Sequence, residues 1–446
     1  MNDQSHAQLH ALVIGGGASG VLAAFHLLRA SPRSRVTLVE RSDRLGAGIA
    51  YGSPDPDHLL NTRVVNMSAL PNDPDHFLHW LQADGQDKTP GCFVSRQTYG
   101  RYLESLLDPW RGSSRLVILQ GEAIRLVESR PRRVTLHLED GRRVSADHAL
   151  LATGHARPRP TTHLEDAWET PGQLPRAGRV AILGTGLSMV DQVISLLKSG
   201  HQGEILAMSR RGLLPQVHHA GQPRAIQLAA VPLGAQASEI LRWLRLEARA
   251  AEAAGGTWRD AVDGLRPYIR ALWSSLPVAT RSRFLRHGAA WWEVHRHRLP
   301  PESAALLQEA QARGQLILQR GAFLDATREG DGVTLRYRPR GTKVVAGLQV
   351  AAVIDCRGIR RDPEAHATPL VQNLLADGLA RIDPLRIGLE TDRQAALVDA
   401  RGLASPIIHA VGPTARAALW EITAVPDIRS QCAELAARLT QPHPAF

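Results

Sequence analysis

Two glycine-rich turns are the parts of this sequence best suited to hold a reactive ligand. The first is the segment Gly15-Gly16-Gly17-Ala18-Ser19-Gly20, in which Gly15, Gly17 and Gly20 have the GxGxxG spacing. It follows the apolar run 11–14, which is typical of a buried parallel strand, and precedes a helical pattern over 21–29. Glycines at this spacing allow a tight turn and let the backbone approach a pyrophosphate at the helix N-terminus. The turn is therefore predicted to bind a dinucleotide.

An acidic residue at the end of the next predicted strand supports this interpretation. The apolar run 36–39 ends in Glu40, at the usual distance beyond the last glycine of the turn. A carboxylate at this position accepts hydrogen bonds from ribose hydroxyls. The same dinucleotide is predicted to contact further residues, namely Ser19, Arg41, Gly46, Gly48, Thr153, Gly154 and Gly412.

The second turn begins at Gly184, after the apolar strand 180–183. Gly186 keeps the spacing, but Met189 replaces the third glycine, which normally allows close packing of helix on strand. The next strand ends in Ser209-Arg210-Arg211 without an acid, and arginine there accommodates a 2′-phosphate. This pattern favours NADPH over NADH, although NADH stays open. The alternative is a structural βαβ unit that carries surface arginines.

Two dinucleotide-binding turns in one chain indicate a flavin site and a nicotinamide site. A strand ends in Ala-Thr-Gly at 152–154, which is similar to the segment where flavoproteins leave the FAD domain. A matching segment, 351–358, marks the predicted return and adds Asp355 and Gly358 to the cofactor contacts. The fold class is therefore α/β, with two Rossmann-like domains, the NAD(P)H domain being inserted in the FAD domain. The predicted divisions are 1–165 for the first part of the FAD domain, 175–349 for the NAD(P)H domain with a helical insertion at about 238–319, and 350–446 for the C-terminal part of the FAD domain.

The amino-acid composition excludes some classes of binding partner. The net charge is +10, but the 53 basic residues are scattered rather than gathered in a patch, which disfavours a nucleic-acid partner. The three cysteines, Cys92, Cys356 and Cys432, form no close pair, which disfavours a disulfide framework and a redox dithiol. No segment has the pattern of a signal peptide or a membrane span. We expect a soluble, cytoplasmic protein that acts on a small molecule.

Longer segments carry a family resemblance. They are 45–52, 58–61, 184–191, 209–215, 292–298 and 420–429. In these segments the sequence resembles the bacterial FAD/NAD(P)-binding proteins, a family of two-dinucleotide flavoprotein monooxygenases. One characterised activity of that family is FAD-dependent urate hydroxylation. The resemblance implies FAD, NADPH and O2 as reactants, with hydroxylation of urate to 5-hydroxyisourate as the specific expectation.

Residue types and positions also suggest candidates for the catalytic residue and for contacts to the substrate. Asn61 is the candidate for an amide close to the flavin where oxygen reacts, with Asn66 as the rival and a turn cap as the alternative role. Trp291 and Trp292 lie in an arginine-rich part of the insertion and could stack on a flat anion. The alternative is a solvated basic face with two buried tryptophans. The spacing of the histidines is wrong for a metal site on one helix face, so no metal is expected.

Three functions remain distinct at this point. The leading one is an NAD(P)H- and O2-dependent monooxygenase, because the chain has no thiol pair to take electrons from a flavin. The alternatives are a flavin-dependent NAD(P)H oxidoreductase or N-hydroxylase acting on another small molecule, and a non-catalytic FAD-binding sensor.

Overall fold

The computed structural model describes residues 9–129, 132–155, 163–167, 176–330, 332–358 and 362–441. Its contacts divide the chain into two compact units. The first contains the described residues of 1–52, 63–158 and 360–446, and the second those of 53–62 and 159–359. Each unit is built around its own sheet of mostly parallel strands.

The first unit has a six-stranded sheet in the order β15-β16-β7-β1-β2-β3. Every neighbouring pair is parallel except β15 with β16. The strands of this sheet are β1 (His10–Ile14), β2 (Arg35–Glu40), β3 (Leu116–Gln120), β7 (His148–Leu151), β15 (Ala396–Val398) and β16 (Ala404–Ala410). Because parallel strands end at one edge, the turns after β1, β2, β7 and β16 share the same side of the sheet.

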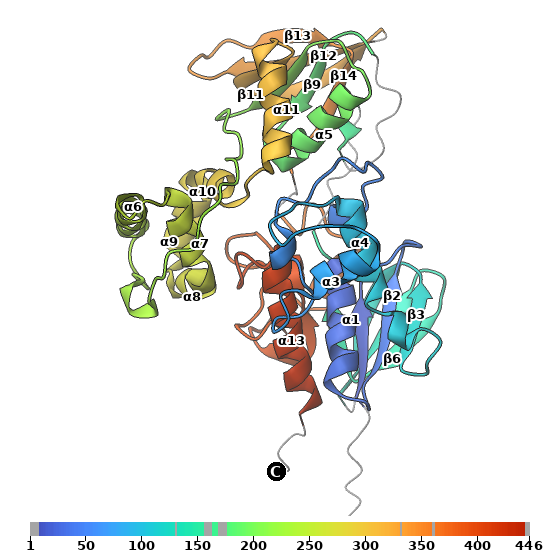
Figure 1. Ribbon diagram of the computed structural model, residues 1–446. Coiled ribbons are helices and arrows are strands. Elements are labelled where there is room, and N and C mark those ends of the chain that lie inside the picture. The colour runs from blue at the N-terminus through green and yellow to red at the C-terminus, as the bar shows by residue number, and fades with distance from the viewer. Residues whose placement is uncertain are drawn as a thin grey trace, which may run out of the picture. The chain divides into compact units, whose positions relative to one another are not determined.

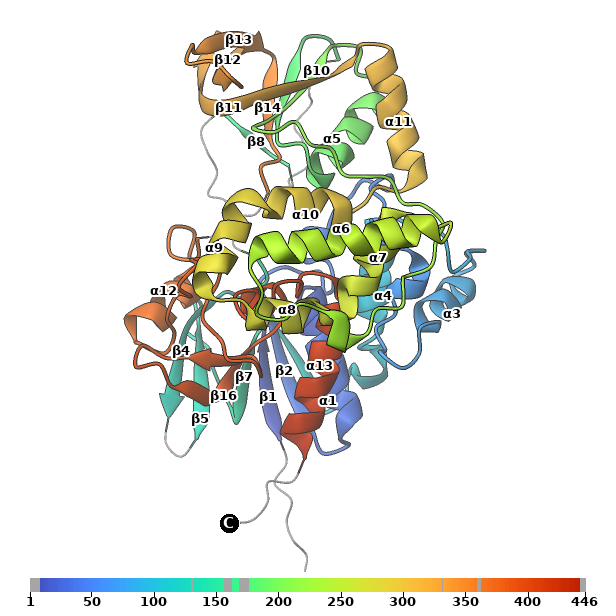
Figure 2. The same ribbon diagram turned by 90° about the vertical axis from the view of Figure 1, so that its left-hand side faces the viewer.

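Apolar side chains on alternate positions of these strands form the core. Leu12 and Ile14 of β1 pack, with Ala149 and Leu151 of β7, against a three-stranded sheet in the order β4-β5-β6. These strands are β4 (Ala123–Ser129), β5 (Arg133–Leu138) and β6 (Arg143–Ala146). Helices α1 (Ala18–Ala30) and α13 (Val425–Thr440) lie side by side in this unit (Figures 1 and 2). Its other helical segments are α2 (Gly48–Tyr51), η1 (Val64–Asn66), α3 (His76–Ala83), α4 (Arg96–Ser105), η2 (Asp108–Trp110), α12 (Pro369–Ala376) and η5 (Gly412–Ala415).

The second unit has a seven-stranded sheet in the order β13-β12-β11-β10-β9-β14-β8. Its strands are β8 (Glu165–Asp166), β9 (Val180–Leu183), β10 (Ile205–Ser209), β11 (Leu316–Glu329), β12 (Gly332–Pro339), β13 (Ala346–Val350) and β14 (Ala352–Asp355). Neighbouring strands are parallel along the series β11, β10, β9, β14 and β8. The pairs β11 with β12 and β12 with β13 are antiparallel. Val180 and Ile182 face one side with α5 (Leu187–Lys198) and α11 (Pro301–Ala312), while Ala181 and Leu183 face the other. This alternation is the reason for the short, uninterrupted apolar runs in the sequence.

A helical insertion follows β10 and precedes β11. Its helices are α6 (Ala237–Ala253), α7 (Trp258–Leu265), α8 (Ile269–Ser275), α9 (Val278–His287) and α10 (Ala289–Arg296), with 3-10 turns η3 (Leu228–Ala230) and η4 (Arg266–Tyr268). Figure 2 shows these helices as a cluster apart from the strands of their own sheet. The last element before β11 is α11, which packs on α5 and belongs to the sheet layer.

The observed units differ from the predicted divisions at three places. Residues 163–165 belong to the second unit, although the prediction placed them in the first part of the FAD domain. Residues 53–62 belong to the second unit, although the chain on both sides of them belongs to the first. Residues 350–358 also belong to the second unit, because β14 pairs with β9 from Ala352 to Asp355. The predicted start at 175 lies outside the described residues. Among the described helices, none has the length and apolar character needed to cross a membrane.

Candidate functional site

The first glycine-rich turn joins β1 to α1 and is closed by contacts that only glycine permits. Gly15 has a φ of +103°, and a Cβ there would lie 2.5 Å from the carbonyl oxygen of Ala152. A Cβ at Gly20 would lie 1.8 Å from the carbonyl oxygen of Gly15. The amide of Gly15 donates to Val39 in β2. These two glycines therefore pack the helix onto the end of the parallel sheet.

Gly17 begins helix α1 and faces a second glycine-rich loop. It forms a bridge with Gly46, whose amide donates to the carbonyl of Gly16 at 2.8 Å. A Cβ on Gly17 would lie 3.4 Å from Cα of Gly48, so a larger side chain would occupy the space between the two turns. Backbone amides at a helix N-terminus are suited to a pyrophosphate, and Gly17 adds no side chain at this end of α1.

Glu40 lies at the carboxyl end of β2, beside the first turn. Its Oε2 accepts a hydrogen bond from the amide of Gly16 at 2.5 Å, and its Oε1 accepts from both the amide and the hydroxyl of Ser42. A carboxylate has about four acceptor positions, so capacity remains for ribose hydroxyls. Arg41 is exposed and lies 4.0 Å from Glu122.

The remaining predicted contacts of the first unit gather at the same edge. The Thr153 hydroxyl lies 3.2 Å from that of Thr414, and Gly154 has a φ of +67°. Gly412 packs on Ser19, and a Cβ there would lie 2.1 Å from Ser19 Oγ. The Gly412 amide donates to the Gln431 side chain, so its role is packing rather than donation to a ligand.

The second turn has the same design with one substitution. Gly184 has a φ of +114°, and a Cβ there would lie 2.3 Å from the carbonyl oxygen of Cys356. Gly186 caps α5, is exposed and has open space around it. Met189, in place of the third glycine, is fully buried in the core with Val193 and Ile182. The turn therefore keeps its first two glycines, of which Gly186 has open space around it, and the methionine supplies core packing.

The three residues predicted to contact the 2′-phosphate, Ser209, Arg210 and Arg211, have different surroundings in the structure. The Ser209 hydroxyl faces inward, where it lies 2.9 Å from Thr185 Oγ1 and accepts from the Gly212 amide. Arg210 is exposed, while Arg211 is half-buried and donates to the carbonyl of Arg286.

Sequence reasoning missed an arginine at this strand end. Arg320 is paired with Ser209 across β10 and β11 and is exposed at the same edge. Its signal is weak in the sequence, because β11 lies more than a hundred residues after β10 begins and follows the whole insertion.

Two further predicted contacts, Asp355 and Gly358, lie at the end of β14. The Asp355 carboxylate binds the Arg357 guanidinium through two bonds of 2.6 and 2.7 Å. The Arg357 guanidinium also stacks 4.7 Å from the ring centre of Phe323. Gly358 has a φ of +79° and nothing within 4 Å of its Cβ position. Both residues belong to the second unit, so they lie at the edge that carries the Gly184 turn.

Asn61 lies in the 53–62 segment, and its backbone is bound by the second unit. The Nε2 of His218 lies 2.9 Å from the carbonyl oxygen of Asn61. His218 follows Val217, which bridges Leu299 beside the helical insertion. The predicted catalytic amide is therefore attached to the unit that carries the second turn.

The structure gives the insertion a different aromatic centre from the predicted one. Trp291, on α10, is 52% exposed. Trp292 lies on the same helix. A cluster of positive and aromatic groups forms instead around Trp258, with Arg259 at 4.4 Å and Arg298 at 5.3 Å from the ring centre. Arg298 is 3% exposed and bound to both oxygens of Asp263, so it is a buried structural charge rather than part of a solvated face.

Arg259 is the second residue that the sequence analysis missed. Its Nε donates to the carbonyl oxygen of Val217 at 2.9 Å, one residue before the histidine that binds Asn61. Within the described residues, that is the hydrogen bond its guanidinium makes. Burial, followed by the neighbouring guanidinium of Arg298, lowers the pKa of Arg259.

The cysteines offer no redox pair. None of the three forms a disulfide, and Cys356 and Cys432 are buried. Burial raises the pKa of both buried thiols, Cys356 and Cys432, which disfavours the reactive thiolate.

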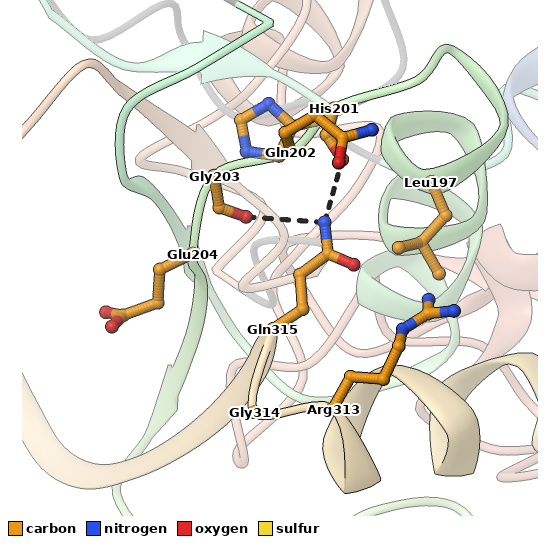
Figure 3. Close-up of a pocket in the computed structure, with 8 residues that line it drawn as sticks. All are labelled: Leu197, His201, Gln202, Gly203, Glu204, Arg313, Gly314 and Gln315. Carbon is orange, nitrogen blue, oxygen red and sulfur yellow. Dashed lines mark hydrogen bonds between the residues drawn. The ribbon is translucent and has the colours of Figure 1, made fainter.

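A cavity of about 610 Å³ lies away from these turns. Most of its lining residues, which Figure 3 labels, come just before β10 or β11 in the chain. The cavity therefore lies at the edge of the sheet opposite to the carboxyl ends of these strands. The Gln315 amide crosses it to the carbonyls of His201 and Gly203. Its place in the fold separates it from the dinucleotide sites.

Comparison with known proteins bears on both units. Residues 12–156 match a family model described as FAD-NAD(P)-binding. No curated protein matches the chain by sequence. L-lysine 6-monooxygenase from Pseudomonas syringae is 17% identical over 98% of this chain and 100% of its own, with a TM-score of 0.65.

Two other solved structures are similar over a comparable length. The ornithine N-hydroxylase of Kutzneria sp. 744 is 16% identical over 97% of this chain and 99% of its own, with a TM-score of 0.64. The FAD-bound cadaverine monooxygenase of Erwinia amylovora is 13% identical over 98% of both chains, with a TM-score of 0.65. At such identities the likeness shows the fold, which confirms the predicted α/β class with two Rossmann-like domains.

Proposed function

We propose that this protein is an FAD-dependent, NADPH-consuming monooxygenase that hydroxylates the nitrogen of a small amine. The observation that carries the proposal is the presence of two glycine-rich turns between strand and helix, at Gly15 and Gly184, in one chain whose three cysteines form no disulfide. FAD in the first unit and NADPH in the second are the cofactors that fit this arrangement.

The first site fits FAD by a test that depends on geometry. A Cβ on Gly17 would lie 3.4 Å from Cα of Gly48, so a side chain larger than a methyl group would fill the space between their turns. Glu40 keeps acceptor capacity beside that space, as a ribose requires. The match of 12–156 to the FAD-NAD(P)-binding family model supports the same ligand.

The second site fits a phosphorylated nicotinamide dinucleotide. Gly186 leaves open space at the N-terminus of α5, where a pyrophosphate is stabilised by backbone amides. Arg210 and Arg320 are exposed at the strand end where a 2′-phosphate would lie. When bound, FAD would accept a hydride from NADPH and pass electrons to O2. The chain's contribution is to hold both cofactors, keep water out and place an amide, for which Asn61 is the candidate.

Amine N-hydroxylation is preferred to urate hydroxylation as the specific reaction. The similar solved structures are named for ornithine, lysine and cadaverine, which are amines. The planar, exposed Trp291 that suited a flat heterocycle has no aromatic partner among the described ring pairs. Urate stays in the test as the competing substrate.

The test is a substrate screen on the purified holoenzyme. Ornithine, lysine, cadaverine and urate are each added while NADPH loss, O2 uptake and released hydrogen peroxide are followed together. The proposal expects one amine to accelerate NADPH oxidation and to yield a hydroxylamine in equal amount. Urate consumed in step with NADPH would reject the amine assignment and keep the monooxygenase.

The screen also separates the other classes. A flavin-dependent oxidoreductase without oxygen insertion would oxidise NADPH and pass the electrons to an added acceptor, with no hydroxylated product. A non-catalytic sensor would bind FAD and leave NADPH unchanged under every condition.

A further inference from the structure

A short piece of the chain leaves the first unit and binds the second. We call residues 53–62 the strap. It begins directly after α2, in the first unit, and its contacts place it in the second unit, after which Arg63 continues the first. A segment of ten residues with no helix or strand of its own is held by side chains, so its partners decide where it lies.

His58 is at the centre of this binding. It is 6% exposed, and its Nε2 lies 2.8 Å from the Ser195 hydroxyl and 3.1 Å from the Asp191 carbonyl oxygen, both on α5. Its Nδ1 lies 2.7 Å from the Ser53 hydroxyl. Because a carbonyl can only accept, the proton belongs on Nε2, and Nδ1 accepts from Ser53. Both ring nitrogens therefore have partners, one within the strap and the other on α5.

Asp55 completes the attachment. The Ser195 hydroxyl donates to its Oδ2, and the Asp57 amide donates to its Oδ1 at 2.9 Å. Burial raises the pKa of Asp55, but the hydrogen bonds from Ser195 and Asp57 and the charges of His58 and Lys198 outweigh it, so the net shift is downward. The carboxylate is therefore charged at neutral pH.

An ion pair between the strap and α5 adds to these hydrogen bonds. Lys198, on the last turn of α5, pairs with Asp57. It is one of three lysines in a chain of 446 residues that otherwise uses arginine for its positive charges.

This cluster has the residue types of a hydrolase triad but not its order. In a triad, the acid holds the histidine nitrogen that faces away from the serine. Here Asp55 accepts from Ser195 itself, and the far nitrogen of His58 faces Ser53. Ser195 is therefore a bridge between the strap and α5 rather than a nucleophile.

Close to its end, the strap contains Asn61, the residue predicted to lie beside the flavin where oxygen reacts. Asn61 lies three residues after His58, and its carbonyl is bound by His218 Nε2 at 2.9 Å. The two attachments, at His58 and at His218, fix both ends of the 58–61 run to the second unit. The contacts of the strap therefore hold Asn61 on the unit that is proposed to bind NADPH.

We propose that His58 is a positioning residue, which holds the strap on α5 so that the Asn61 amide is carried by the NADPH-binding unit. The inference rests on the proposed function, because Asn61 has a role only beside a bound flavin. It assigns to the bonds between His58 and Ser195 the task of keeping the electrons of NADPH from being lost as hydrogen peroxide.

The first arm of the test uses the protein without cofactors. Hydrogen exchange of the 53–62 amides is compared in wild type, Ser195→Ala and Ser199→Ala. Ser199 follows the same end of α5, and among the described residues its hydroxyl donates to the carbonyl of Leu196, within the helix. We expect exchange of the strap to become about tenfold faster in Ser195→Ala and to stay unchanged in the control. Unchanged exchange in Ser195→Ala would overturn the attachment.

The second arm uses the holoenzyme and needs no substrate. NADPH, H⁺ and O2 give NADP⁺ and hydrogen peroxide, and the rate of peroxide release reports how well the reacting oxygen is held. Ser195→Ala and His58→Gln should raise this rate about tenfold, while the rate of flavin reduction by NADPH without oxygen stays the same. A merely structural role would instead lower flavin content and slow reduction.

A double variant separates His58 from general damage. If the strap acts through Asn61, then adding His58→Gln to Asn61→Ala should raise peroxide release no further than Asn61→Ala alone. Additive effects would overturn the proposal. A protein that takes up no FAD would overturn the proposed function and the role of Asn61, and the hydrogen-exchange result would still report the attachment of the strap.

Discussion

The carboxylate of Glu40 receives the amide proton of Gly16 across the first turn, with 2.5 Å between Oε2 and N. The same side chain thus shapes the turn and offers acceptors to a ribose. Glu40→Ala should weaken FAD binding by about 10–100-fold, since a hydrogen bond to a charged group contributes about 1.5–3 kcal/mol. Flavin fluorescence titration of the apo-protein measures it. Glu139→Ala, at an exposed position of the same unit, is the control. Full flavin affinity in Glu40→Ala would remove Glu40 from the site.

The choice between NADPH and NADH depends on the arginines at the end of β10 and β11. Arg210→Ala and Arg320→Ala should each raise the KM for NADPH about tenfold or more and leave that for NADH unchanged, because only NADPH carries the 2′-phosphate. Steady-state oxidation of both nucleotides gives the comparison. Arg328→Ala, near the far end of β11, is the matched control. Equal losses for both nucleotides would show that these arginines do not read the phosphate.

The methionine of the second turn should be a packing residue. Met189 is fully buried against Ile182 and Val193. Met189→Gly, which restores the common glycine, should destabilise the second unit by at least the about 2–5 kcal/mol of a buried Met-to-Ala change. Thermal unfolding and the KM for NADPH are measured together. If the variant were as stable as wild type and bound NADPH better, the methionine would be a defect of the site.

A buried histidine in the first unit should make stability fall in acid. His409 is 4% exposed, neither ring nitrogen has a hydrogen-bond partner in the described residues, and its ring stacks 5.7 Å from that of His148. Burial, followed by the charges of His148 and Arg438, lowers the pKa of His409 to about 3. The unfolded chain binds this proton near pH 6.5, so the folded state loses stability as the pH falls from about 6.5 toward 3.

The expected size can be read from urea unfolding at pH 7.5 and pH 5. His409→Leu should remove about 2 kcal/mol of the loss that wild type shows between these pH values. His79→Gln, exposed on α3, should change nothing. Parallel losses in wild type and His409→Leu would contradict the prediction.

What the sequence reveals depends on how local each feature is. The turns at Gly15 and Gly184 are predictable because their strand, glycines and helix lie within about twenty residues, and the first glycine of each turn is required by close backbone contacts. The place of β14 is not, because its apolar run suits either sheet and its pairing with β9 joins segments far apart.

The site residues follow the same division. The attachment of His58 to Ser195 spans 137 positions, and no periodicity of the strap points to α5. The burial of Arg298 with Asp263 likewise turns a residue of an apparently solvated basic stretch into a core ion pair. Short-range chemistry can thus be inferred from types and spacing, whereas the unit to which a loop belongs depends on tertiary contacts.

Arg259 gives the sharpest test of the substrate. Its guanidinium lies over Trp258 and donates from Nε to the residue before His218, which binds Asn61. Its terminal nitrogens can take both oxygens of a carboxylate. Arg259→Gln should therefore raise the KM for ornithine or lysine about tenfold or more, since a charged hydrogen bond is lost. Cadaverine, which has no carboxylate, serves as the internal control and should keep its KM.

The outcome of that comparison separates recognition from packing. The stack on Trp258 would be lost with either substrate, so a change due to packing alone would raise KM for the amino acids and for cadaverine alike. Arg259→Lys keeps the charge but not the two parallel donors, and it should recover only part of the amino-acid KM. An equal KM for all amines in the Gln variant would place the substrate carboxylate elsewhere, while leaving the assignment of FAD and NADPH as it stands.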